Sequence, residues 1–498
     1  MKQLFSHSFI DSFAYRFENI YQSLGFLLPE TALLAGIVLL LLLAIITRKA
    51  YGMRIAFWAV AVMMATLFAQ LFFLVGQLRS FSSEAPLYLM ADTLCVFHPL
   101  QIQARIALTL GALLFGVVFL FELLGRHRNE SVEWLFWGLS ALLGLDLLLL
   151  SAHFLTFYLS FELSSIATYF LLSVGRQRRQ HEALIKYVLF GAFASALMLY
   201  GISWIYGLAG SMDFTQADFW HHLQKAPSLW LYIAWALFAA GVFFKLSVVP
   251  FHFWAPDAYE GAPAMSLAFV SAMPKVAILA FMMLLSRQMV AFAALQTVWG
   301  QLLMAVALAS LLLGNFAALR QQNLKRLLAY ATIAHMGTLL LPVVAIGYEG
   351  AEAVFLYYWA VYALALFVIF ALASHQQIEQ IADLRRFHCS TGTKLAWGVV
   401  AFSLTGLPPT AGFLGKLGVF VHFWKMAASY HFALLLWATA LLSTAVALAY
   451  YIKIPYALFF KQESKVGAPT TGVDAALLPA MIIALLLVLA ILWAYPFA

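Results

Sequence analysis

The chain has 498 residues, of which 64% are hydrophobic and only 10% charged, and its mean hydropathy is +0.92. Soluble domains average about 25% charged residues, so this composition excludes a soluble protein and indicates an integral membrane protein. The formal net charge of +7 is first a topology signal, since loop lysines and arginines orient membrane proteins, and it predicts no nucleic-acid partner. The two cysteines, Cys95 and Cys389, lie far apart and indicate neither a disulfide framework nor a metal or redox site.

Long apolar runs follow one another along most of the chain, and each is long enough to cross a bilayer as a helix. Residues 1–26 are mixed and weakly amphipathic, without the layout of a cleaved signal peptide, so we expect this segment to be retained. The predicted fold is an all-α polytopic membrane protein with about fourteen transmembrane helices. They are placed at residues 27–47, 55–76, 104–124, 131–150, 152–174, 183–207, 229–254, 264–285, 297–318, 323–346, 351–375, 394–427, 431–460 and 474–497.

Basic residues gather in alternate connections between these helices. The positive-inside rule places those connections in the cytoplasm and both termini on the periplasmic face of a bacterial inner membrane. The residues that carry this signal are Arg48, Lys49, Arg54, Arg126, Arg128, Arg176, Arg178, Arg179, Arg320, Lys325, Arg326, Arg385, Arg386, Lys461 and Lys465.

The seventh predicted helix carries a lysine and then breaks. Lys245 lies among apolar residues, and Pro250 and Pro256 follow it. Proline removes a backbone donor and clashes with the preceding turn, so the helix is predicted to be interrupted at membrane depth. A lysine beside such a break indicates a site on an ion or proton path. The alternative is a lysine whose ammonium group snorkels to the membrane interface.

The twelfth predicted helix contains a second break at residues 405–412, TGLPPTAG, followed by Lys416. Paired interruptions separated by about five helices are typical of inverted-repeat transporters, and an odd helix number inverts the second copy. We therefore predict two inverted five-helix repeats, each with a broken helix. The predicted divisions are an N-terminal segment 1–26, helices 1–3 at 27–124, a first repeat at 131–285, a second repeat at 297–460 and a last helix at 474–497.

Further ionisable residues lie at membrane depth in other predicted helices. Glu162 in the fifth helix needs a cation, and Lys245 is its candidate partner, either in a proton path or in a purely structural ion pair. Lys275 in the eighth helix adds an ammonium group, and desolvated lysines change protonation readily. His335 in the tenth helix is either a bridge between lysines or a satisfied core histidine. Together with Lys416 these residues predict a proton relay.

Other residues carry weaker signals. Asp146 is an intramembrane carboxylate close enough to a predicted boundary that an interfacial role is equally open. His252, Asp257 and Glu260 follow the first break and are expected to cap helix ends or line a water entry. No phosphate-binding loop, dinucleotide turn or metal-ligand spacing is present in the sequence.

Three segments in order resemble the antiporter-like subunits of respiratory complex I: VVPFHFWAPDAYEGAP at 248–263, LKRLLAYATIAHMG at 324–337 and GLPPTAGFLGK at 406–416. The resemblance runs from about Pro29 to the last predicted helix, and within the family it is most similar to the subunit N branch. Two features support that branch, namely Lys416 where subunit M is expected to have a glutamate, and the lack of a long lateral helix such as marks subunit L.

The resemblance implies that Glu162 and Lys245 match the family's glutamate–lysine pair, Lys275 its central lysine and Lys416 its terminal residue. It implies a place in the membrane arm beside another antiporter-like subunit, small K- and J-like chains and lipid. It also implies proton pumping driven by quinone reduction elsewhere. No cofactor is expected in this chain, whereas NAD, FMN, iron–sulfur clusters and quinone are expected in partner subunits. Asp146 and His153 depart from the family pattern.

We expect Glu162 to release Lys245 when a neighbouring subunit displaces charge, so that the proton moves laterally through Lys275 and His335 to Lys416. Two other functions share the same features. A self-sufficient or Mrp-type cation/proton antiporter would exchange sodium or potassium for protons when reconstituted alone. A scaffold subunit with inactive ion pairs would tolerate loss of Lys275 and Lys416.

Overall fold

The structure, a computed structural model, describes residues 25–46, 53–80, 87–89, 95–125, 131–174, 178–386, 391–428 and 431–460. Within these ranges the chain is helical apart from connections and one short antiparallel pair, β1 (Leu87–Leu89) with β2 (Cys95–Phe97). In chain order the helices are α2 (Leu28–Ile46), α3 (Met53–Ser80), α4 (Pro99–Gly125), α5 (Ser131–Leu150), α6 (Phe154–Ser173), α7 (Arg178–Ala209), α8 (Ala217–Gln224), α9 (Ser228–Leu246), α10 (Trp254–Gly261), α11 (Ala264–Met289), α12 (Ala293–Leu319), α13 (Leu324–Val344), α14 (Ala351–Gln376), α15 (Asp383–Arg386), α16 (Thr391–Thr405), α17 (Ala411–Ala427), α18 (His431–Tyr451) and α19 (Lys453–Phe460).

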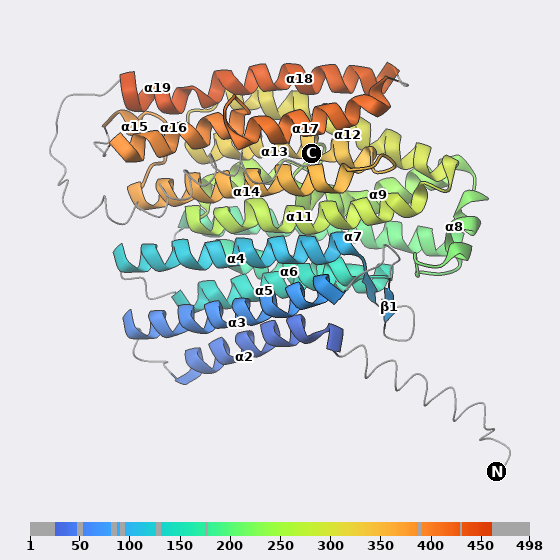
Figure 1. Ribbon diagram of the computed structural model, residues 1–498, viewed down its shortest axis with the longest axis horizontal. Coiled ribbons are helices and arrows are strands. Elements are labelled where there is room, and N and C mark those ends of the chain that lie inside the picture. The colour runs from blue at the N-terminus through green and yellow to red at the C-terminus, as the bar shows by residue number, and fades with distance from the viewer. Residues whose placement is uncertain are drawn as a thin grey trace, which may run out of the picture.

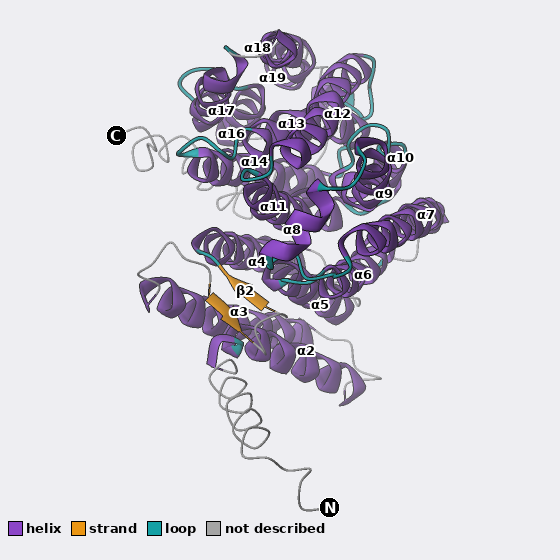
Figure 2. Ribbon diagram, turned by 90° about the vertical axis from the view of Figure 1, so that its right-hand side faces the viewer, coloured by secondary structure: helices purple, strands orange, loops and turns teal. Residues whose placement is uncertain are grey.

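The long helices lie side by side with roughly parallel axes (Figure 1). Among the described residues, 12 segments are long and apolar enough to span a membrane, with α18 and α19 counted as one. Figure 2 looks towards the ends of the helices and shows α2 and α3 at one edge of the bundle and α18 and α19 at the other. Between them, α11 and α13 are buried along almost their whole length. The chain is therefore a multi-pass membrane protein with a buried central row of helices.

The predicted helices agree with these elements over most of the chain. The predicted twelfth helix, 394–427, corresponds to α16 and α17, which are each shorter than a full span. The predicted fourteenth helix, 474–497, lies outside the described residues, as does most of the predicted segment 1–26. The total of about fourteen helices therefore stays a prediction.

The first break begins at Leu246, about one turn before Pro250. The seventh helix was expected to continue over 229–254, but α9 ends at Leu246 and Ser247 adopts the left-handed conformation with φ 61°. The Ser247 N–H donates to the Phe244 carbonyl at 2.9 Å, and the Val248 N–H donates to the Phe243 carbonyl at 3.0 Å. This pattern is a Schellman motif, which satisfies carbonyls that the helix end would leave without donors.

The second break repeats the same local geometry. Gly406 follows the last residue of α16 with φ 85°, a conformation that glycine adopts without steric cost. Its N–H donates to the Ser403 carbonyl at 3.1 Å, and the Leu407 N–H donates to the Phe402 carbonyl at 3.1 Å. Pro408 and Pro409 then separate α16 from α17. The structure thus interrupts the chain at both predicted places and ends the preceding helix in the same way each time, whereas the depth of the breaks in the membrane stays a prediction.

Several pairs of described helices approach so closely that only glycine fits between them, among them α5 with α6 and α12 with α13. A Cβ on Gly144 of α5 would lie 2.6 Å from the backbone nitrogen of Ser164 in α6. A Cβ on Gly314 of α12 would lie 2.6 Å from the backbone nitrogen of Ala334 in α13. Close backbone approach at small residues is typical of packing between membrane helices. These pairs open the two segments predicted as repeats, whereas the inverted relation between the segments stays a prediction.

Ion pairs join the short helix α10 to basic residues of α7 and α13. The Asp257 carboxylate accepts from Lys186 of α7 at 3.1 Å and from Arg326 of α13 at 2.8 Å. Glu260 accepts from Arg326 at 2.9 Å. Burial alone would raise the pKa of Asp257, but the hydrogen bonds from Lys186 and Arg326 outweigh it, so the pKa lies below its ordinary value of 3.8. Arg326, predicted as an orientation signal, therefore also fixes the segment after the first break.

Substitution of Gly412 by alanine tests the packing at the second break. The added Cβ would lie 1.8 Å from the Ser403 carbonyl oxygen, which is backbone and cannot move aside cheaply. We expect a loss of stability of about 1–3 kcal/mol or more, measured as thermal unfolding of the purified chain by circular dichroism. Gly398→Ala in α16 is the control, because nothing lies within 4 Å of its Cβ position. Equal unfolding temperatures for the two variants would contradict the described contact.

Substitution of Asp257 by asparagine tests the ion pairs of α10. Because the folded-state pKa of Asp257 is depressed, its contribution to stability is present above the ordinary pKa of 3.8 and is lost as the pH falls through the folded value. The side chain is more than a third exposed, so we expect a loss of at most about 1 kcal/mol at neutral pH. The wild-type and D257N unfolding temperatures should converge in acid. Glu182→Gln, which removes a more exposed partner of Lys186, is the control and should have a smaller effect.

Candidate functional site

Lys245 lies in the last turn of α9, completely enclosed by neighbouring helices. Its Nζ donates to Ser165 Oγ and to Thr168 Oγ1 of α6, both at 3.0 Å. The ammonium group also lies 5.8 Å from the ring centres of Phe161 and Tyr169. Hydroxyl oxygens and aromatic faces stabilise a buried cation without supplying a counter-charge. The alternative that Lys245 snorkels to the membrane surface is therefore wrong.

Glu162 was predicted as the direct partner of Lys245, and among the described residues no ion pair joins them. The Glu162 carboxylate is half-buried and accepts a hydrogen bond from the hydroxyl group of Ser195 in α7. The Ser195 Oγ also lies 3.2 Å from the Tyr158 hydroxyl oxygen. Glu162 and Lys245 are close enough to interact electrostatically. The structure thus brings the two residues to one interface and places the hydroxyl of Ser165, one turn beyond Glu162, on the lysine.

Lys275 lies in the middle of α11, directly after Pro274, and is fully buried. Its Nζ has no hydrogen-bond partner among the described residues. A buried ammonium group without hydrogen bonds is strongly unfavourable, whereas a neutral amine or a hydrated ammonium is tolerated. Lys275 therefore requires either the neutral amine or water beside its Nζ.

His335 of α13 is held between two tyrosines. Its Nδ1 lies 2.7 Å from the Tyr358 hydroxyl of α14, and its Nε2 lies 3.3 Å from the Tyr451 hydroxyl of α18. His335 also interacts electrostatically with both Lys275 and Lys416. A neutral imidazole donates through one nitrogen and accepts through the other, so either tautomer fits between two hydroxyl groups. His335 is thus satisfied within the core and also lies within electrostatic range of both lysines.

Lys416 lies in α17, just beyond the second break. Its Nζ donates at 2.7 Å to the carbonyl of Thr405, and Thr405 is the last residue of α16. A cation at the C-terminal end of a helix satisfies a carbonyl without an intrahelical donor and interacts favourably with the helix dipole. Tyr358 packs against Gly415, the residue before Lys416, since a Cβ on Gly415 would lie 2.8 Å from its ring. The break therefore supplies the polar partner of Lys416.

The sequence interpretation missed the hydroxyl groups that contact these residues: Ser165, Thr168, Ser195, Tyr358 and Tyr451. One signal was available. Buried tyrosines need a partner for the hydroxyl group, and the pairs Tyr357–Tyr358 and Tyr450–Tyr451 both stand in apolar runs. The serines and threonine carry no such signal, because a helix can satisfy them through its own carbonyls.

The remaining candidates have structural contacts. His153 caps the start of α6, where its Nδ1 accepts from the Leu155 N–H at 3.2 Å. His252 lies in the first break, and burial lowers its pKa. Asp146 is fully buried within the bundle and accepts from Gln70 of α3, while the interfacial alternative for it stays a prediction. Among the described residues, no group of three or more His, Cys, Asp or Glu side chains is arranged to hold a metal ion.

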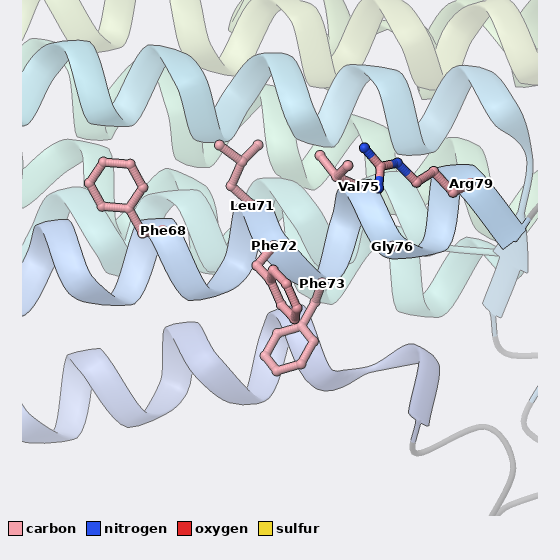
Figure 3. Close-up of a pocket in the computed structure, with 7 residues that line it drawn as sticks. All are labelled: Phe68, Leu71, Phe72, Phe73, Val75, Gly76 and Arg79. Carbon is pink, nitrogen blue, oxygen red and sulfur yellow. The ribbon is translucent and has the colours of Figure 1, made fainter.

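A groove on the surface of α3, with a volume of about 630 Å³, lies apart from these residues. Figure 3 shows that its lining comes from one helix, with aromatic rings along it and a guanidinium group at one end. The lining residues are Phe68, Leu71, Phe72, Phe73, Val75, Gly76 and Arg79. None of them belongs to the predicted relay.

Comparison with known proteins identifies the family of this chain. A family model described as "NADH:quinone oxidoreductase/Mrp antiporter, TM" matches residues 151–443. NADH-quinone oxidoreductase subunit N 1 of Thermodesulfovibrio yellowstonii is 34% identical over 381 residues, covering 74% of this chain and 79% of that protein. Subunit N of Coxiella burnetii is 35% identical over 393 residues, covering 74% and 78%.

A chain of respiratory complex I from Thermus thermophilus has a similar structure, with a TM-score of 0.75 and 26% identity. The match covers 93% of this chain and 97% of that one. The family match includes both broken helices and the positions of Glu162, Lys245, Lys275, His335 and Lys416. The chain therefore belongs to the NADH:quinone oxidoreductase/Mrp antiporter transmembrane family, and within it to the subunit N branch of the NADH-quinone oxidoreductases.

Proposed function

We propose that this chain is a proton-translocating subunit in the membrane arm of an NADH-quinone oxidoreductase. The observation that carries the proposal is the row of buried basic groups, Lys245, Lys275, His335 and Lys416, in adjoining helices at membrane depth. Ionisable side chains inside a membrane are costly and mark ion or proton paths. Membership of the subunit N branch supports the same function.

The first step depends on how strongly Glu162 favours the charged form of Lys245. The two groups interact electrostatically, while the hydrogen bonds of Lys245 go to Ser165 and Thr168. A hydroxyl oxygen accepts from an ammonium group, and its O–H can donate to a neutral amine, so this environment accommodates both protonation states. Negative charge displaced towards Glu162 from a neighbouring subunit would favour the ammonium form and retain the proton on Lys245. Withdrawal of that negative charge would favour release of the proton.

The released proton then passes laterally through Lys275 and His335 to Lys416. Lys275 has no competing partner among the described residues, so water is proposed to join it to Lys245 and to His335. Tyr358 links the His335 Nδ1 to the region beside Lys416. Lys416 releases the proton on the periplasmic side. The relay then takes up a new proton from the side of the basic connections, which is predicted to be cytoplasmic. Moving one charge across the membrane requires about 2.3 kcal/mol per 100 mV.

The proposed membrane, orientation and partner subunits follow from the basic connections and from the family. The chain lies in a bacterial inner membrane with both termini on the periplasmic side, beside another antiporter-like subunit and small K- and J-like chains. Complex I in the similar Thermus thermophilus structure supports membrane-arm partners. NAD, FMN, iron–sulfur clusters and quinone are proposed to reside in partner subunits, with quinone reduction driving translocation and no cofactor in this chain.

A cation/proton antiporter subunit, alone or of the Mrp type, is the second candidate, because the family description covers both kinds of protein. It differs in what the chain would do by itself. Proteoliposomes that contain only this chain would exchange sodium or potassium for protons if it were an antiporter. The names of the relatives favour the oxidoreductase subunit. Sodium-driven proton movement in such vesicles would reverse this preference.

Replacement of Lys245 by alanine tests the relay. We expect the complex to assemble and to oxidise NADH, but with proton translocation abolished or severely reduced, because the first ammonium group of the path is removed. Inside-out membrane vesicles with a pH-sensitive dye report translocation. Lys225→Ala is the control, since Lys225 is exposed at the end of α8. Full pumping by an assembled K245A complex would overturn the assignment.

Replacement of Tyr358 by phenylalanine tests the link between His335 and Lys416. Loss of one buried hydrogen bond, about 1.4 kcal/mol, should slow proton translocation by about tenfold and enlarge its solvent isotope effect. Tyr450→Phe is a matched control, because Tyr450 is equally buried but its hydroxyl donates to Asn315 at 3.2 Å. If both variants pump alike while K245A does not, the Tyr358 step is wrong and the relay stands.

A further inference from the structure

A cluster of charged and polar side chains is buried on the opposite side of the bundle from Lys416. It contains Glu30 of α2, Gln70 of α3, Arg105 of α4 and Asp146 of α5, which we call the acidic cluster. Arg105 donates to Glu30, and Gln70 donates to Asp146 Oδ2. Figure 1 shows these four helices next to one another in the N-terminal part of the bundle, with α17 and α18 at the far side. The acidic cluster is therefore separate from the proposed relay.

The acidic cluster has unused hydrogen-bonding capacity. Among the described residues, no partner contacts Arg105 Nε and Nη1, Glu30 Oε2, Gln70 Oε1 or Asp146 Oδ1. Four helices thus direct two donors and three acceptors into one completely buried region. Buried polar atoms are rarely left unsatisfied, and ordered water is the usual partner where both donors and acceptors line a space. The geometry therefore indicates that water joins these groups.

The charges of the acidic cluster do not balance when both carboxyl groups are ionised. Arg105 carries one positive charge that it does not lose, against two carboxylates. Arg105 and Glu30 act electrostatically on Asp146, and Gln70 donates a hydrogen bond to it. The helices α6 and α11 also pack on α5, but neither Glu162 nor Lys275 acts on Asp146. An uncompensated buried negative charge is strongly unfavourable.

We propose that the acidic cluster is a proton-binding site outside the relay, in which Glu30 is ionised and paired with Arg105 while Asp146 holds one proton from the aqueous phase. The contacts fit this assignment. Asp146 Oδ2 accepts from the Gln70 amide, as a carboxylic acid carbonyl does, and Oδ1 is free to carry the proton and donate to water. The site is neutral as a whole with the proton bound.

One consequence distinguishes this arrangement from a simple buried acid. The single guanidinium group serves whichever carboxyl group is ionised, so the protonation of Asp146 depends on the charge of Glu30. If Glu30 is made neutral, Arg105 balances the charge of Asp146 instead, and Asp146 releases its proton to water. The two carboxyl groups on α2 and α5 thus share one proton and one cation.

The test is infrared spectroscopy of the full chain in phospholipid nanodiscs at neutral pH, with carbon-13 in the aspartate carboxyl groups. A protonated aspartate gives a carbonyl stretch that moves on labelling and in heavy water. We expect that band in the wild type, and we expect its loss in D146N. The Asp213→Asn variant is the matched control and should keep the band, because Asp213 is also buried but accepts hydrogen bonds from Thr215 and Gln216.

Glu30→Gln provides the decisive comparison, since it leaves Asp146 in place and should still remove the aspartate band. Absence of the band in the labelled wild type, or its persistence in D146N, would overturn the proton-binding site. Persistence in E30Q would overturn the shared charge of the acidic cluster. The labelled wild type needs no substitution, so the proposal can be refuted even if a variant does not fold.

Discussion

Every polar group at membrane depth in this protein has to find its partner inside the protein, because lipid offers no hydrogen bonds. The ends of α9 and α16 at the two breaks would leave carbonyls without donors. The Schellman turns at Ser247 and Gly406 satisfy part of them, and Lys416 satisfies the Thr405 carbonyl. At the second break the helix end and the buried lysine therefore satisfy each other, whereas Lys245 at the first break takes its partners from α6.

Hydroxyl groups, and not carboxylates, contact Lys245 and His335. A direct carboxylate partner would hold a lysine in its charged form and oppose release of the proton. Ser165, Thr168 and the tyrosines at His335 can donate as well as accept, so they remain partners when the proton has left. Glu162 influences Lys245 through space and leaves its hydrogen bonds unchanged.

Charged groups elsewhere are arranged differently. Asp257 and Glu260 pair with Lys186 and Arg326 near the aqueous end, where these groups are partly exposed. There the ion pairs position α10 at modest cost, because solvent still screens the charges. The acidic cluster has no such access to solvent, and its single guanidinium group faces two carboxyl groups. Buried carboxyl groups thus depend on the cations and donors within the bundle, whereas the exposed ones also have solvent.

The sequence by itself determined the membrane-spanning runs, the two breaks and the lysines beside them. Hydropathy, proline and intramembrane charge are local signals, and they act within a few turns of one helix. It also determined the family, because three motifs occur in order.

The tertiary structure decided the end of α9 at Leu246, which depends on a left-handed Ser247 that no local preference indicates. It alone decided the partners, because Lys245 meets Ser165 from 80 residues away and His335 meets Tyr451 from 116 residues away. Contacts between helices depend on how the helices pack, and no single segment of the chain determines that packing.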